Sequence, residues 1–355
     1  MPEVGSFSIA PLDIPADSSL AKELPRLKRH LKSESTRLQE WHREGADGRE
    51  VCAARSAVID TLLATLFDWT LDTFEPKKRE RKLTMSLVAI GGYGRSELNP
   101  HSDIDFMLLH SGTTPSVTRI FNHELIEKLT GPEGLIYTLY DLGMKVGYSV
   151  RNIQDAVNVA NDDMQTKTSL IESRLISGDA GLFEQFQKRV EVKCVRSHID
   201  DYLQMRIADQ DARRVKFGNS ALLQAPNIKN GCGGLRDYQN LLWMTHFKYG
   251  TRTLAELEAQ EMIRPNNRAQ LEEGYGFLLR VRNELHYQTK RPSDDLHKAL
   301  QPKVAWQLGY KDRSPARRLE AFMRDLYMHM RRIHLITRMV ERRLALRPKP
   351  SRRIP

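Results

Sequence analysis

The chain has 355 residues, of which 40% are hydrophobic and 28% are charged. This composition is that of a globular protein with room for two domains, and no apolar run approaches the roughly 18 residues of a membrane span. The formal net charge is +10, but most of it lies between residues 331 and 355, where eight arginines and one lysine stand against one glutamate. This clustering favours a solvated helix face that leads into a basic tail, and it disfavours nucleic acid as a partner.

The three cysteines are far apart and lack CxxC spacing. Such an arrangement argues against a disulfide framework or a structural zinc site and fits the reducing cytoplasm. No basic residue precedes Lys22, and the first stretch contains prolines and acids, so it is neither a secretory signal nor a transit peptide. We expect residues 1–44 to form a loose arm and a helix.

The next part, residues 45–150, predicts a small α/β domain. Apolar residues at helical spacing indicate helices, and compact apolar runs that end at glycine or at a turn signal indicate strands. In chain order we expect a helix over 53–74, strands over 86–92 and 104–110, a helix over 121–130, a turn at GPEG, and a strand or strand pair over 135–150.

Beyond residue 150 the pattern is almost wholly helical, which predicts a helical bundle over 151–345. The expected helices are 164–179 with a glycine stop, a long run over 180–216, and then 238–250, 268–289 and 318–346, with a glycine-rich break at 225–237. Residues 346–355 are expected to be a basic tail or linker. The predicted fold class is α+β, with a small sheet domain followed by a mostly helical domain.

Two aspartates one residue apart open the predicted strand over 104–110. Successive residues of a strand point to opposite faces, so Asp103 and Asp105 share one face. Two carboxylates at this spacing repel each other unless a cation lies between them, and oxygen ligands favour Mg²⁺ or Mn²⁺. Paired divalent ions can activate an attacking oxygen and neutralise a leaving pyrophosphate.

Glycines precede this pair at the end of the preceding strand. Gly91 and Gly92 let the backbone approach a ligand closely, and Arg95 offers a fork of donors for phosphate oxygens. A phosphate-binding turn followed by a carboxylate pair indicates nucleotidyl transfer. A dinucleotide fingerprint, an EF-hand loop and a Walker loop fit worse, because their glycine or lysine positions are missing. The plain alternative is a strand–turn–strand with surface aspartates.

The stretch GGYGRSEL…SDIDFM resembles GGYGRGEL…SDIDLL of the PII uridylyltransferase family, the bifunctional uridylyltransferase/uridylyl-removing enzymes. That family lies within the DNA polymerase β-type nucleotidyltransferase superfamily. Further similar stretches are LYDLGMKVGYSVR (139–151) with TSLIESRLISGD (168–179), PNIKNGCGGLRDYQNLLW (226–243) and FLLRVRNELHYQTKR (277–291). The resemblance covers roughly residues 45–345 and implies a nucleotidyltransferase domain followed by a helical substrate-binding domain.

The resemblance also implies roles for single residues. Asp141, in a strand-like segment, matches a third carboxylate that completes the metal site or acts as general base; the alternative is a loop aspartate before a strand. Ser96 and Ser102 fall in the nucleotide-binding stretch. Lys229 and Arg236 would contact triphosphate or base from a second loop, and the alternative is a glycine turn that caps the next helix.

Three residues depart from the family pattern. Ser96 stands where the family has glycine, Tyr148 where it has histidine, and Cys232 where it has proline. None of these removes a carboxylate or a leading glycine, so we expect the chemistry to be retained. Family members continue into an HD phosphohydrolase domain and two ACT domains, whereas this sequence has no His-Asp dipeptide, and we expect it to be an N-terminal fragment.

The predicted function is Mg²⁺-dependent transfer of UMP from UTP to a tyrosine of the PII signalling protein in the cytoplasm. One alternative is a transferase-only relative that adenylylates another protein or a small molecule. Another is a catalytically silent module that binds nucleotide and regulates. A nucleic-acid end-modifying enzyme is a weaker fourth hypothesis.

Overall fold

The computed structural model describes residues 3–74, 83–112, 123–197 and 199–346. It divides into two compact units, Met1–Ser197 and His198–Pro355. The predicted domain boundary after residue 150 falls inside the first unit, so the functional domains inferred from the sequence remain a prediction. The predicted basic tail lies almost wholly outside the described residues. No helix in the described ranges is both long and apolar enough to cross a membrane.

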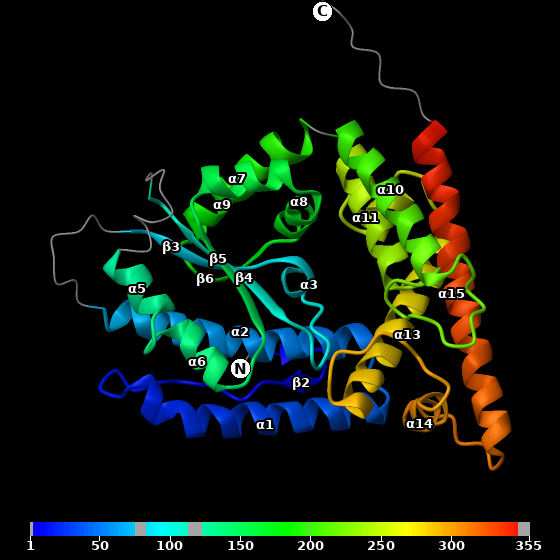
Figure 1. The fold of residues 1–355 in the computed structure, drawn as a ribbon, viewed down its shortest axis with the longest axis horizontal. Coiled ribbons are helices and arrows are strands. Elements are labelled where there is room, and N and C mark those ends of the chain that lie inside the picture. The colour runs from blue at the N-terminus through cyan, green and yellow to red at the C-terminus, as the bar shows by residue number, and fades with distance from the viewer. Residues whose placement is uncertain (1–2, 75–82, 113–122, 198, 347–355) are drawn as a thin grey trace, which may run out of the picture. The chain divides into compact units, whose positions relative to one another are not determined.

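The first unit is built around a four-stranded mixed sheet (Figure 1). Its strands are β3 (Met85–Ala89), β4 (Ile104–His110), β5 (Val146–Arg151) and β6 (Arg174–Gly178). The strand order is β5-β4-β3-β6, in which β3 is antiparallel to β4 and β6, and β4 is parallel to β5. The predicted strand over 104–110 is confirmed, because its contiguous apolar residues are buried between two helical layers.

Helices cover both faces of this sheet, as Figure 1 shows. They are α1 (Leu20–Glu44), α2 (Gly48–Asp72), α5 (Glu124–Thr130), α6 (Leu135–Asp141), α7 (Ile153–Asp162), α8 (Met164–Ile171) and α9 (Ala180–Val190). One core joins α2, α5 and α6 to Leu87, Phe106 and Leu108 of the sheet. On the other face α9 contacts β3, β4 and β6. The expected α+β fold class is confirmed.

The segment that begins at residue 3 is packed on the helices, which corrects the expected loose arm. Two short strands, β1 (Glu3–Val4) and β2 (Phe7–Ser8), form an antiparallel hairpin. Phe7 and the following Ile9 are buried in a small core with Leu38 of α1 and Val58 of α2. The apolar residues of this stretch therefore pack on the two long helices, although its prolines and acids indicate a loop.

Two expected elements are wrong in part. The stretch predicted as a strand over 135–150 begins with helix α6, because three of its apolar residues (Leu135, Ile136 and Leu139) are buried at helical spacing. The stretch predicted as a helix over 164–179 ends in strand β6, which pairs with β3. The long helix expected over 180–216 is interrupted by a π-helical turn, Glu191–Val195, before α10.

The second unit consists of helices in its described part. They are α10 (Ile199–Phe217), α11 (Leu235–Tyr249), α12 (Leu254–Ala259), α13 (Pro265–Thr289), α14 (Gln301–Gln307) and α15 (Pro315–Leu346). The helices α11, α13 and α15 contact one another, and α10 packs on α11. The helical bundle predicted over 151–345 is present from residue 199 onward, whereas residues 151–197 belong to the first unit and include strand β6 of its sheet. The short helices α12 and α14 were not predicted.

A buried tyrosine links three elements of the first unit near the end of β3. The short helix α3 (Gly91–Gly94) contains Tyr93, which is 1% exposed and donates its hydroxyl to Asp60 of α2 at 2.6 Å. Arg174 of β6 donates to both carboxylate oxygens of Asp60 at 2.8 and 3.0 Å. Burial, and then the charge of Asp60, raises the pKa of Tyr93, so the phenol stays protonated as a donor. This network fixes α3 against α2 and β6.

The Tyr93→Phe variant tests this network. Removing the hydroxyl deletes a charge-assisted hydrogen bond, so we expect the free energy of unfolding in urea to fall by about 1–2 kcal/mol. Tyr140→Phe is the matched control, because Tyr140 is 48% exposed. Equal stability of the two variants would contradict a structural role for the Tyr93 hydroxyl.

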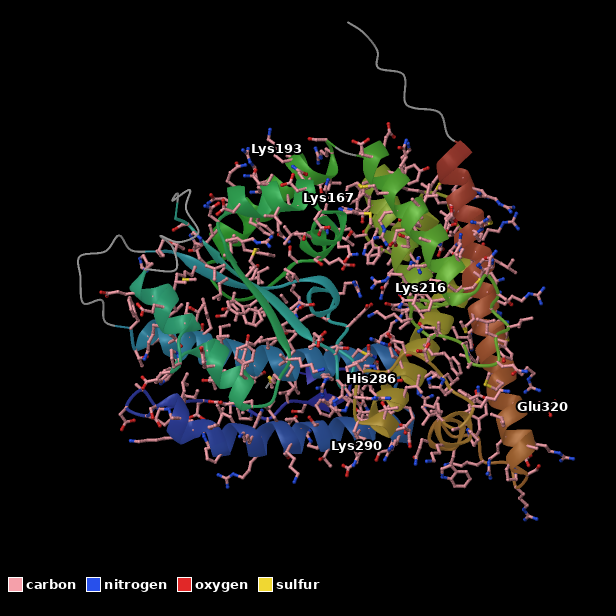
Figure 2. The ribbon with its side chains drawn as sticks, viewed as in Figure 1. Lys167, Lys193, Lys216, His286, Lys290 and Glu320 are labelled. Atoms are coloured by element: carbon pink, nitrogen blue, oxygen red, sulfur yellow. The ribbon has the colours of Figure 1, made fainter. Side chains whose placement is uncertain are left out.

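Ser96 has a left-handed backbone conformation, with φ of +60°. Among the described residues two other non-glycine positions share this conformation, Glu261 and Lys290, the latter at the C-terminus of α13 (Figure 2). For an L-residue the left-handed region costs roughly 1–2 kcal/mol. A glycine at this position, as in the family pattern that the sequence resembles, would adopt this conformation without that cost.

We therefore expect Ser96→Gly to stabilise the first unit. Relief of backbone strain outweighs the added entropy of the unfolded chain and leaves a net gain of about 0.5–1 kcal/mol in the free energy of unfolding. Asn219→Gly is the control and should lower the free energy of unfolding. Asn219 is exposed and is not among the positive-φ residues, so glycine there relieves no backbone strain. A loss of stability in Ser96→Gly, measured by urea denaturation, would show that the serine side chain is required at this turn.

Candidate functional site

One edge of the sheet brings together the predicted glycines and aspartates. There β3 ends, and β4, β5 and β6 begin. Ile90, which follows β3, donates its N–H to the carbonyl of Asp105 at 3.0 Å. Ile104 donates in the same way to Lys145, just before β5, at 2.9 Å. Residues far apart in the sequence therefore meet at this edge because the strand register places them there.

Asp103 and Asp105 lie at the start of β4, and both side chains are exposed. Asp105 belongs to the strand, whereas its neighbours Ile104 and Phe106 are buried on the opposite face. The alternation predicted from the sequence is thus present in the strand. Two exposed carboxylates at this spacing are oxygen donors of the kind that a hard divalent cation prefers, and their role as a metal-binding pair stays a prediction.

Asp141 lies elsewhere than expected. It is the last residue of helix α6 and is exposed, so the strand-like segment predicted around it is wrong. Across the described ranges no group of three or more His, Cys, Asp or Glu side chains is placed to hold a metal ion. Strand β5, which pairs with β4, has the sequence VGYSVR and brings no carboxylate. The role of Asp141 as a third acid stays a prediction.

The donor pair suits magnesium even without a third protein acid. Mg²⁺ is commonly bound through one or two carboxylates together with substrate phosphates and water. Asp103 and Asp105 supply such a pair, and the adjoining turn is where phosphates are expected. In this arrangement the nucleotide itself would provide the remaining ligands.

The turn after β3 is packed closely against the end of α8. A side chain at Gly94 would begin 1.9 Å from the carbonyl oxygen of Glu172, and one at Gly91, whose φ is +59°, would begin 3.4 Å from Ser169 Oγ. The intrahelical bonds of α3 start with the N–H of Gly94, which donates to Ile90. The N–H groups of Gly91 and Gly92 precede that bond, at the position where helix starts bind anions.

Arg95 is engaged in ion pairs that hold this turn. Its Nε donates to Glu97 at 2.7 Å, and its Nη1 donates to Glu172 at 2.5 Å. The Arg95 side chain is only about one fifth exposed. Arg95 thus joins α3 to the end of α8, and its predicted contact with phosphate stays a prediction, as do those of Ser96 and Ser102, both half-buried.

The second predicted loop, residues 226–237, is a compact turn before α11. The amide of Asn227 donates to Asp295 at 2.7 Å and accepts from the N–H of Asn230 at 2.7 Å. Gly233 has φ of +74°, and a side chain there would begin 1.9 Å from the carbonyl of Met330 on α15. A glycine turn thus precedes α11, as the structural alternative expects, and the predicted contact of this loop with a nucleotide stays a prediction.

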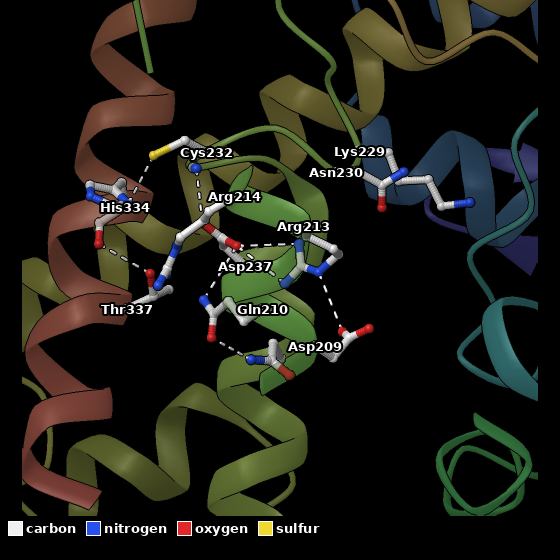
Figure 3. A network of polar contacts seen from close by, with 12 residues as sticks. Asp209, Gln210, Arg213, Arg214, Lys229, Asn230, Cys232, Asp237, His334 and Thr337 are labelled. Carbon is white, nitrogen blue, oxygen red and sulfur yellow. Dashed lines mark hydrogen bonds and ion pairs between the residues drawn. The ribbon is translucent and has the colours of Figure 1, made fainter. Parts of the chain in front are cut away.

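Lys229 and Arg236 differ in their surroundings. The Arg236 guanidinium lies over the ring of Trp243 at 5.1 Å from its centroid. Lys229 is half-buried, and Figure 3 shows its side chain extending away from the polar network formed by the neighbouring residues. Contacts of these two cations with a nucleotide stay predictions.

That polar network was not predicted, and it lies within the second unit (Figure 3). Asp237 is 1% exposed, accepts from the N–H of Gly233 at 2.9 Å, and is 3.5 Å from Arg213. Gln210 donates to Glu341 of α15 at 2.6 Å and accepts from Asn240 at 2.7 Å. The one local signal was the acid three residues after Gly234, a spacing that satisfies donors at a helix start.

Cys232 lies beside this network and contacts an imidazole. Its Sγ is 3.1 Å from Nδ1 of His334 on α15. Burial, and then the charge of Asp237, raises the pKa of Cys232 to about 11. Burial also lowers the pKa of His334. Both shifts favour a protonated thiol beside a neutral imidazole, which is the opposite of the environment that activates a thiolate nucleophile.

Comparison with known proteins identifies the family to which this chain is similar. Residues 201–341 match the family described as GlnD PII-uridylyltransferase. The bifunctional uridylyltransferase/uridylyl-removing enzyme of Rhodospirillum rubrum is 33% identical over 83% of this chain and 31% of that protein. Enzymes of the same name from Erythrobacter litoralis and Caulobacter vibrioides are 32% and 30% identical over 82% and 83% of this chain and 31% and 30% of their own lengths.

The chain spans about a third of the length of these curated relatives. The similarity extends well beyond the single stretch of glycines and aspartates, since it covers both units of the structure. The chain therefore contains a region of the PII uridylyltransferase/uridylyl-removing enzyme family.

Proposed function

We propose that the chain transfers UMP from UTP to a tyrosine hydroxyl of a PII-type signalling protein, in a reaction that depends on Mg²⁺ or Mn²⁺. The observation that carries this proposal is the pair Asp103 and Asp105, exposed together on one sheet edge beside the glycine turn of α3. The uridylyl group and the PII acceptor are suggested by the family and by the relatives that the chain resembles.

The residues at this edge of the sheet would have different roles in such a transfer. Asp103 and Asp105 would hold the divalent cation, which neutralises charge on the triphosphate and on the leaving pyrophosphate. The glycine turn lets the triphosphate approach the backbone, and Arg95 keeps the turn in place through its two ion pairs. Catalysis of this kind is mainly positioning and charge stabilisation, since phosphoryl centres need little covalent help from the protein.

One observation favours a second candidate function. The described residues contain no three-acid group, and a site with two carboxylates suffices to bind a metal–nucleotide complex without turning it over. The second candidate is therefore a regulatory module that binds nucleotide and does not transfer it. Retention of both aspartates at the glycine turn favours the transferase, because nucleotide binding alone tolerates loss of a carboxylate.

The reducing cytoplasm is part of the proposal. Support comes from the three cysteines, all of which are free and buried in the structure. A neutral Cys232 beside His334 is consistent with a thiol kept reduced.

The aspartates provide the decisive test. We expect Asp103→Asn and Asp105→Asn each to lower kcat for incorporation of labelled UMP into a PII protein by about 100-fold or more, because charge stabilisation of this type contributes on that scale. The assay uses labelled UTP with Mg²⁺, and parallel reactions with the other three nucleotides measure base preference.

Asp162→Asn, an exposed aspartate at the end of α7, is the matched control and should leave kcat unchanged. Asp141→Asn measures the role of the third acid separately. Wild-type turnover in both Asp103→Asn and Asp105→Asn would refute the transferase mechanism. UTP binding without turnover in the wild-type chain would support the regulatory module instead.

A further inference from the structure

Gly147 of β5 lies directly opposite Asp105 in the parallel pairing of β5 with β4. A Cβ atom built on Gly147 would lie 2.4 Å from Oδ1 of Asp105. Real Cβ atoms do not approach an oxygen so closely, because the repulsive part of the van der Waals interaction is steep at that distance. The present position of the Asp105 carboxylate is thus compatible only with glycine at 147.

The backbone of β5 does not itself require glycine there. Gly147 is absent from the glycines with positive φ, so its conformation is one that any residue adopts. Glycine within a strand costs roughly 0.5–1 kcal/mol relative to alanine, and its occurrence often marks a close approach by another group. The next residue, Tyr148, carries a large side chain and stacks on Phe106 with a centroid distance of 6.4 Å. Space beside Asp105 is therefore the reason for glycine at 147.

The group that approaches Gly147 is the end of a short, flexible side chain. If residue 147 acquired a methyl group, the Asp105 carboxylate would rotate away and the backbones of β4 and β5 would stay paired. Such a substitution separates stability from function, because it leaves the strands intact and moves one member of the carboxylate pair.

We infer that Gly147 is a positioning residue of the candidate site, which holds open the place of the Asp105 carboxylate and the space next to it for a cation. The inference rests on the proposed function, since it gives Asp105 a role in metal binding. It explains a residue of the stretch 139–151 that the resemblance marks but to which no chemistry has been assigned. According to this inference β5 contributes to the site although it carries no acid, because its glycine leaves room for the Asp105 carboxylate.

Gly147→Ala tests the inference by two measurements. Titration with Mn²⁺, followed by electron paramagnetic resonance without nucleotide, should show affinity weakened by about tenfold or more, the scale seen when groups that orient metal ligands are changed. UMP transfer at fixed Mg²⁺ should fall with it, and raised Mg²⁺ should restore part of the activity. The melting temperature should stay within a few degrees of wild type.

Ser149→Ala is the matched control, two residues along the same strand and on the same face as Gly147, and should leave Mn²⁺ affinity unchanged. Wild-type Mn²⁺ affinity in Gly147→Ala would overturn the inference. If the wild-type chain binds Mn²⁺ but transfers nothing, the proposed transferase function fails, whereas weaker Mn²⁺ binding by Gly147→Ala would still support the positioning role.

A second variant covers the case in which Gly147→Ala loses stability. The shorter side chain of Asp105→Ser removes the oxygen that an alanine at 147 would meet, so the double variant should recover the melting temperature of Asp105→Ser alone. Failure to recover would place the clash at another atom and overturn the inference.

Discussion

The candidate site depends on two backbones that approach each other where only glycine fits. At Gly94 a side chain would begin 1.9 Å from the carbonyl oxygen of Glu172, so the turn after β3 meets the end of α8 because that side chain is missing. Arg95 then pairs with the carboxylate of the same Glu172. The Ile90–Asp105 hydrogen bond ties this turn to β4. The place of the aspartates relative to the turn is therefore set by main-chain contacts, which are stiffer than contacts between long side chains.

The parts of the fold that follow from local pattern were predicted, and the parts that depend on distant partners were not. Strand 104–110 contains the apolar run 106–109, and the face expected for Asp103 and Asp105 follows from strand alternation alone. Strand β6 was read as the end of a helix, because a five-residue run fits either period until β3 pairs with it. Short apolar runs of this kind are decided by tertiary contacts.

The same distinction applies to the site residues. Arg95 was assigned to phosphate on its chemistry, yet its partner Glu172 is 77 residues away in the sequence and leaves no local sign. Asp141 was placed in a strand from the apolar pattern and given its role by resemblance, but the buried spacing of its predecessors makes it the end of a helix. Gly147 carries no functional group and could be recognised only after the register placed it opposite Asp105.

A family motif combines residues that build the fold with residues that do chemistry. In the loop before α11, several motif residues make contacts that stabilise the fold. Asn227, Gly233 and Asp237 each satisfy backbone or side-chain groups of their own unit. These contacts give each of the three a structural role, because a buried acid and a left-handed glycine are costly to replace. Lys229 extends away from this network (Figure 3), but its positive charge, together with that of Arg282, lowers the pKa of Asp294 in the same unit. A cation of the motif can thus stabilise the fold as well, so its presence in the motif does not by itself indicate contact with a nucleotide.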